Sequence, residues 1–255
     1  MKIVAISLTA VLSLSTSVAQ ARDKSPTARK VAQIGLELGP TWQGRNDVRI
    51  PGNSGDEFSL LDVAGVGPFL AGRLWVNWAP WRRHEFRFVW APLRIEGTQA
   101  LKQPISFDDT QFATGIDTKG AYKFDTYRWT YRFVFYDGER WKWRIGGTLL
   151  LRDAEISLLQ GGAYASNSNI GLVPLIHFAG SVRFAQRWSA ELTADGLYVG
   201  KLGRAFDVAL RFGFDVTDSW TAFAGYRMLE GGSDNDDVYT FAWLHYAVFA
   251  LAYRF

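Results

Sequence analysis

Three histidines, His84, His177 and His245, carry the side chain that most often serves acid–base chemistry near neutral pH. A hydrolase built on a strand needs a hydroxyl nucleophile within hydrogen-bond reach of such an imidazole. Ser181 shares a strand face with His177 but follows it by four residues, which is ~13 Å along a strand. That separation is too large for a nucleophile–base pair. We therefore expect His177 to be hydrogen-bonded to a neighbouring carboxylate.

The acidic groups offer no stronger site. Residues 234–237 contain three aspartates and one asparagine, and Asp108 and Asp109 form a second acidic pair. Clustered carboxylates suit Ca²⁺, but the spacing of an EF-hand loop is absent, so a solvated turn is the simpler interpretation. His84 adjoins two arginines at a turn and is expected to be exposed. We predict no catalytic, cofactor-binding or metal-binding residue and no enzymatic activity.

The elements that would position these residues are strands. Ten segments place apolar side chains at every second position, the pattern of half-exposed strands. Their apolar faces lie within residues 32–38, 70–78, 86–90, 127–135, 141–151, 172–184, 188–194, 206–216, 220–226 and 247–255. Short connections at 79–83, 137–140, 185–187 and 217–219 alternate with longer ones at 42–65, 95–120, 157–169, 197–203 and 230–238. Transmembrane barrels have this asymmetry of short periplasmic turns and long extracellular loops.

Two longer connections contain further apolar residues. Phe58, Leu60 and Leu61 in residues 42–65 are consistent with a short helix. Residues 104–125 are expected to extend the flanking strands above the membrane, with a β-bulge near Asp125 to account for a change of parity. If either stretch crossed the membrane, the strand count would become twelve.

The end of the chain carries the clearest resemblance. The last strand ends in Phe255, with Tyr253 and Leu251 on the same face, and resembles the closing strand of bacterial outer-membrane β-barrel proteins. Tryptophans beside all four short connections resemble the aromatic girdle of those proteins. These tryptophans are Trp78, Trp81, Trp141, Trp188 and Trp220. Stretches such as residues 127–133, 171–175 and 225–232 look like an uncharacterised family of such barrels.

The resemblance implies an all-β fold, an antiparallel up-and-down transmembrane β-barrel of ten strands, with eight or twelve as alternatives. It also implies an integral outer-membrane protein of a Gram-negative cell with both termini periplasmic. The implied partners are outer-membrane lipid and lipopolysaccharide, together with the barrel-assembly machinery, which would read the strand that ends in Phe255.

The start of the chain agrees with export. Lys2 precedes an apolar stretch, and Ala19-Gln20-Ala21 is a small-x-small cleavage site. We predict a signal peptide over residues 1–21, a short periplasmic segment over 22–30 and the barrel over 31–255. The chain has no cysteine, which excludes disulfides and thiolate metal sites, and its net charge of +3 gives no indication of nucleic-acid binding.

The strand face opposite to the apolar one is charged and should line the lumen. It contains Glu37, Arg73, Glu85, Arg87, Arg128, Arg132, Lys142, Arg144, His177, Arg183, Glu191, Asp195, Asp207, Arg211 and Arg227. One interpretation is a filled lumen in which arginines and carboxylates pair, because a barrel of this size is narrow. The other is a narrow channel that favours anions, because nine cations face five acids.

Three functions therefore stay open: a structural or surface-interaction barrel, a small-solute channel that favours anions, and an enzyme that hydrolyses lipid or peptide. The omptin proteases are also ten-stranded and carry a His–Asp pair and an Asp pair at the extracellular rim, but this chain matches them too weakly for their function to be carried over. Asp108 and Asp109 resemble the second pair, but the closely spaced Asp and His of omptins are missing here. We predict the first function.

Overall fold

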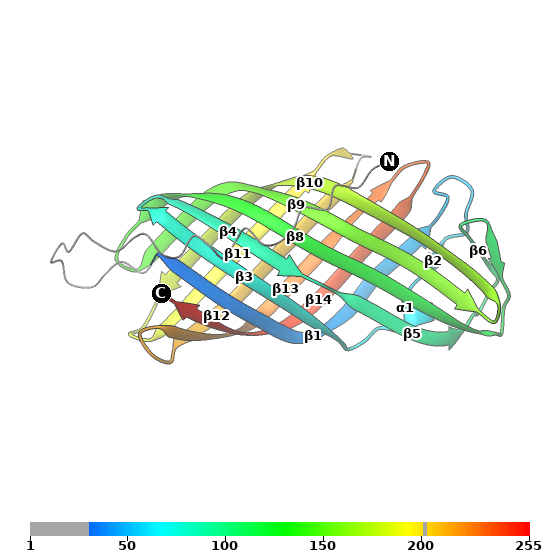
Figure 1. Cartoon of the computed structure of the whole chain (residues 1–255), viewed down its shortest axis with the longest axis horizontal. Helices are drawn as coiled ribbons and strands as arrows, with labels where there is room; N and C mark the ends of the chain where they lie inside the picture. The colour runs from blue at the N-terminus through cyan, green and yellow to red at the C-terminus, as the bar shows by residue number, and fades with distance from the viewer. Residues whose placement is uncertain (1–30, 201–202) are drawn as a thin grey trace, which may run out of the picture.

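The computed structural model describes residues 31–200 and 203–255, which form a closed antiparallel β-barrel (Figure 1). The predicted signal peptide, residues 1–21, and the predicted periplasmic segment, residues 22–30, lie outside the described residues. The strands are β1 (Ala32–Arg49), β2 (Phe58–Ser59), β3 (Phe69–Trp81), β4 (His84–Ala91), β5 (Arg94–Ala100), β6 (Ile105–Phe107), β7 (Thr110–Phe112), β8 (Asp117–Asp137), β9 (Trp141–Gln160), β10 (Ala163–Arg183), β11 (Trp188–Tyr198), β12 (Arg204–Asp215), β13 (Trp220–Asp234) and β14 (Tyr239–Arg254). One short helix, α1 (Leu61–Ala64), follows β2.

The barrel closes between its first and last strands. β14 pairs antiparallel with β1 in a register that places Leu36 opposite Leu251 and Gln33 opposite Arg254, and Figure 1 shows these blue and red strands side by side. β4 and β5 pair with successive parts of β8 in one continuous register, so they form the two halves of a single barrel strand. Counting them once gives ten barrel strands, as predicted. Closure gives both β1 and β14 a strand partner on each side.

The predicted outward faces are exposed and apolar. Side chains such as Leu36, Trp129 and Phe212 are about half exposed and surround the barrel in a continuous band. The predicted girdle tryptophans are all exposed at the end that carries the short turns. Exposed apolar surface this extensive fits hydrocarbon and not water. No described helix is long and apolar enough to span a bilayer. We call the end with the short turns the turn end and the opposite one the loop end.

The connections at the loop end differ from the prediction, because most of their residues belong to strands. β9 continues to Gln160 and β10 begins at Ala163, so a two-residue turn replaces the predicted loop at 157–169. A membrane strand needs only about ten residues, so strands of about twice that length rise beyond the apolar band. Pairing satisfies the backbone of these residues, which is why they form strand and not loop.

The segment between β1 and β3 contains the predicted short helix, and we call residues 50–68 the plug segment. It places β2 and α1 against β1, β5 and β8 at the loop end. The predicted bulge near Asp125 is wrong, because β8 keeps an unbroken register against β5 and β9 there. Tyr122 has inward parity for a different reason: its ring is buried in the apolar core beneath the plug segment.

Candidate functional site

The interior is divided into three levels, and the loop-end level is apolar. Inward positions of the extended strands supply Ile95, Tyr122, Ile156 and Leu158, and the plug segment supplies Phe58, Leu60 and Val63. The β6–β7 hairpin adds Phe107, whose ring meets Phe58 edge to face with centroids 5.7 Å apart. These side chains are buried and form one core, which closes the loop end of the barrel.

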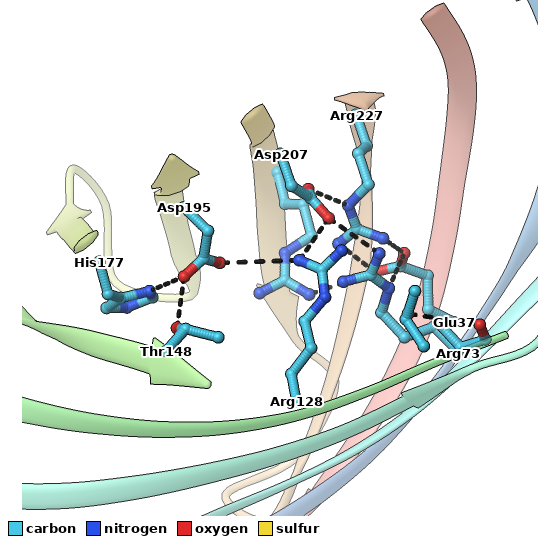
Figure 2. Close-up of polar contacts among 11 residues, drawn as sticks. Glu37, Arg73, Arg128, Thr148, His177, Asp195, Asp207 and Arg227 are labelled. Atoms are coloured by element: carbon cyan, nitrogen blue, oxygen red, sulfur yellow. Dashed lines mark hydrogen bonds and ion pairs between the residues drawn. The ribbon is translucent and has the colours of Figure 1, made fainter. Parts of the chain in front are cut away.

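The middle level is a charged network, which Figure 2 shows with its contacts. We call it the central network, and it consists of Glu37, Arg73, Arg128, His177, Asp195, Asp207, Arg211 and Arg227. These residues come from β1, β3, β8, β10, β11, β12 and β13, and all were predicted to face the lumen. Inward parity on strands far apart in the sequence brings them together across the lumen, since the barrel wraps the strands round one axis.

Two carboxylates organise the arginines of the central network. Asp207 lies 3.2 Å from Arg73, 2.6 Å from Arg128 and 3.1 Å from Arg227. Glu37 accepts hydrogen bonds from Arg227 and Arg211, the latter at 3.4 Å. Each carboxylate therefore serves more than one guanidinium, and each guanidinium of Arg73 and Arg227 contacts both carboxylates. Such pairing offsets the cost of removing the charges from water.

His177 has the partner that the sequence predicted. Its Nδ1 lies 2.8 Å from Asp195, which also accepts a hydrogen bond of 2.5 Å from the hydroxyl of Thr148. A His–Asp pair is the arrangement that orients a general base in many hydrolases. Ser181, however, contacts Arg144 and not His177, and the His177 Nε2 atom has no hydrogen-bond partner among the described residues. His177 is only 1% exposed and lies inside the central network.

The other candidate groups lie apart from the lumen. His245 faces outward, where its Nδ1 lies 2.5 Å from the hydroxyl of Tyr226. His84 was predicted to be exposed but is half-buried against the hydroxyl of Tyr131, at 2.8 Å. Asp108 and Asp109 form the turn of the β6–β7 hairpin with positive φ angles. Among the described residues, no group of three or more His, Asp or Glu side chains is arranged to hold a metal ion.

The turn-end level is open, and its form was not predicted from the sequence. A cavity of about 260 Å³ lies there, lined by residues of eight strands that include Arg87, Arg132 and Arg144. Trp75, which was not among the predicted lumen residues, is only 1% exposed, and its ring lies 4.8 Å from the guanidinium of Arg87 and 5.6 Å from that of Arg211. Its inward orientation could have been predicted, because Trp75 stands between Leu74 and Val76, which face outward, and side chains alternate between the two faces of a strand.

Comparison with known proteins gives the fold and nothing finer. No family model matches the sequence, and no curated protein is similar to it. Among solved structures, the outer-membrane protease OmpT from Escherichia coli superposes with a TM-score of 0.59 at 10% identity, over 91% of this chain and 99% of that one.

Two further solved structures resemble the chain less well. The attachment invasion locus protein Ail of Yersinia pestis has a TM-score of 0.43 at 13% identity, over 88% of this chain and 99% of that one. The toluene transporter TodX of Pseudomonas putida has a TM-score of 0.39 at 8% identity, over 89% and 91%. The chain therefore has the fold of the integral outer-membrane β-barrel proteins of Gram-negative bacteria.

Proposed function

We propose that this protein is a non-conducting outer-membrane barrel with a structural or surface-interaction role. The observation that carries the proposal is that side chains fill the lumen at two successive levels, the central network and the apolar core beneath the plug segment. A cavity between these two levels, lined by Arg73, Arg227 and Leu93 among others, has a volume of only about 30 Å³. A solute would have to displace both levels to cross.

The loop end supports the surface-interaction part of the proposal. There β8, β9 and β10 rise beyond the apolar band as a paired wall, in which Lys123 contacts Asp153 at 2.6 Å. Tyr164, at the tip of the β9–β10 hairpin, is 58% exposed. A rigid surface that presents charged pairs and a tyrosine suits recognition of another macromolecule. The partners predicted from the sequence, lipopolysaccharide and the barrel-assembly machinery, stay predictions.

Planar-bilayer recording of the refolded protein tests the proposal. We expect no steady conductance from protein whose folding is confirmed by a mobility shift between unheated and boiled samples on a gel. A reproducible ohmic conductance would show that the lumen is a channel, and its ion selectivity would test the anion-favouring alternative. For the enzyme alternative, product analysis with lipid and peptide substrates compares the wild type with the variants His177→Ala and His245→Ala. We expect the wild type to form no more product than either variant.

An engineered disulfide would distinguish a plug segment that closes the lumen permanently from one that moves to open it. The chain has no cysteine, and a Cβ on Gly120 would lie 3.2 Å from the Cβ of Val63 in α1, close to disulfide geometry. The double variant Val63→Cys, Gly120→Cys would therefore fix the plug segment to β8. We expect the oxidised and reduced forms to be equally non-conducting. Conductance that appears only on reduction would show a movable plug and contradict the proposal.

A further inference from the structure

The cavity at the turn end, which we call the vestibule, is a built cavity at the mouth of the barrel. Its lining includes Val31, which precedes β1, Ala79 near the end of β3 and Arg254 at the end of β14. The volume of about 260 Å³ is several times the ~30 Å³ that one water occupies in the liquid. Short turns face the periplasm in barrels of this fold, so the vestibule opens toward that compartment.

Cations outnumber carboxylates in the vestibule. The lining includes five cationic and two acidic side chains: Arg87, Arg132, Lys142, Arg144, Arg254, Glu85 and Glu191. Glu85 is shared by three cations, with separations of 3.0 Å to Arg132, 2.8 Å to Arg144 and 3.5 Å to Lys142. Glu191 pairs with Arg211 of the central network at 3.0 Å. The vestibule therefore holds positive charge that its own carboxylates do not neutralise.

Arg87 is a buried cation of the vestibule that this arrangement leaves without a counterion. Only 8% of the residue is exposed, yet no carboxylate of the described residues lies within 4.0 Å of its guanidinium. Its contacts are a long hydrogen bond of 3.5 Å from Nη1 to the amide oxygen of Asn77 and the ring of Trp75, 4.8 Å away. A buried cation without an anionic partner is costly. By contrast, Arg132, which is also buried and lines the same cavity, has Glu85.

We propose that the vestibule binds a phosphate-bearing anion that pairs with Arg87. A guanidinium presents two parallel N–H donors that match two oxygens of a phosphate, and Trp75 fixes its plane from one side. Arg132, Lys142 and Arg144 line the same cavity, so their charge adds to the attraction. Several converging cations favour a dianion over a monoanion, and low local dielectric strengthens each contact. This site does not depend on whether the barrel conducts.

Two substitutions remove the proposed site in opposite ways. Arg87→Gln deletes the unpaired charge. Asn77→Asp keeps the shape of the side chain but places a carboxylate beside Arg87, which would become its internal counterion and exclude an external one. Arg183→Gln is the matched control, because Arg183 lies at the same end of the barrel but pairs with Asp215 at 3.1 Å and is not part of the lining.

Calorimetric titration of the refolded protein with inorganic phosphate, at constant ionic strength, tests the proposal. We expect saturable binding to the wild type and to Arg183→Gln. Both vestibule variants should bind at least about tenfold more weakly, the scale of a lost charge-assisted hydrogen bond. Should Arg87→Gln fail to fold, Asn77→Asp decides, since it adds a favourable ion pair. The proposal would be overturned if the wild type showed no saturation by about 10 mM phosphate, or if both vestibule variants bound phosphate with wild-type affinity.

A second arm identifies the source of the phosphate group. The titration is repeated with protein in vesicles of phosphatidylcholine and in vesicles that also contain phosphatidic acid, whose headgroup is a phosphomonoester. If phosphatidic acid abolishes the binding of free phosphate, a lipid headgroup enters the vestibule. If binding is unchanged, the occupant is a free anion from the periplasmic side. Both outcomes require the saturable, Arg87-dependent binding of the first arm.

Discussion

The carboxylate of Asp207 and the guanidinium of Arg128 lie 2.6 Å apart in the middle of the lumen, where both side chains are buried. Asp207 also contacts Arg73 and Arg227, so one carboxylate neutralises charge from three strands other than its own. Backbone hydrogen bonds hold the barrel wall together, but the pairing of the buried arginines in the lumen depends on the carboxylate of Asp207.

Replacement of Asp207 by asparagine should therefore destabilise the barrel strongly. Asp207→Asn keeps the size of the side chain but leaves three buried arginines with one fewer counterion, and breaking a buried pair costs about 3–5 kcal/mol. Urea unfolding in lipid vesicles, followed by tryptophan fluorescence, measures the loss. Asp62→Asn is the control, because its pair with Lys102 is exposed and worth less than about 1 kcal/mol. Equal effects of the two variants would show that the central network contributes nothing to stability.

The position of the apolar band predicts how much an arginine on the outer face destabilises the barrel at different depths in the bilayer. Leu210 faces outward in the middle of β12, so Leu210→Arg should destabilise by roughly 2–4 kcal/mol, the cost of arginine at the bilayer midplane. Leu159 is equally exposed but lies beyond the band, near the end of β9, so Leu159→Arg should cost about 0–1 kcal/mol. Unfolding free energies in vesicles test both. A reversed order would mean that the membrane surrounds a different part of the barrel.

The core at the loop end predicts a local effect. Phe107 is fully buried and packs edge to face on Phe58 of the plug segment, so Phe107→Ala should cost about 3–5 kcal/mol of local stability. The barrel strands keep their pairing, and the gel mobility shift should therefore persist. Limited trypsin digestion should cut the variant faster than the wild type at Arg49, which borders the plug segment. Unchanged digestion would show that Phe107 does not hold the plug segment.

Side-chain alternation was sufficient to predict the wall of this protein. The parity of Leu36, Trp129 and Leu251 gave the strand faces, because only one face of each strand can contact lipid at low cost. The same parity placed Asp207 and its arginine partners in the lumen. It could not show which cation pairs with which acid, since that depends on barrel register and tilt, which bring β3, β8, β12 and β13 to one level.

The two ends of the lumen were beyond prediction for a related reason. The inward turn of the plug segment depends on apolar partners such as Tyr122 and Leu158, which are brought together only when the long strands have paired. The lack of a counterion for Arg87 could likewise not be predicted from the sequence, because Glu85 lies two positions away on the same strand face and could have paired with it. Only the folded barrel shows that Glu85 turns to Arg132 and Arg144 instead.

A pair at the boundary of the apolar band gives a pH-dependent prediction. Asp125 forms a two-pronged ion pair with Arg94, in which Nη2 and Oδ2 lie 2.8 Å apart. The hydrogen bond from Arg94 holds the pKa of the Asp125 carboxyl below its usual value. A carboxyl with a lowered pKa in the folded state stabilises that state at neutral pH. This contribution is lost as the pH falls below the unfolded pKa of about 3.9 and through the lower folded one.

The variant Asp125→Asn isolates that contribution. Arg94 is half exposed, so solvent screening limits the pair to less than about 1 kcal/mol at pH 7, and the variant should be less stable by that amount. The difference from the wild type should narrow as the pH falls from 5 toward 2, because protonation then removes the same charge from Asp125. Urea unfolding at a series of pH values measures it. A difference that stays constant across this range would mean that Asp125 stabilises the barrel through packing and not through its charge.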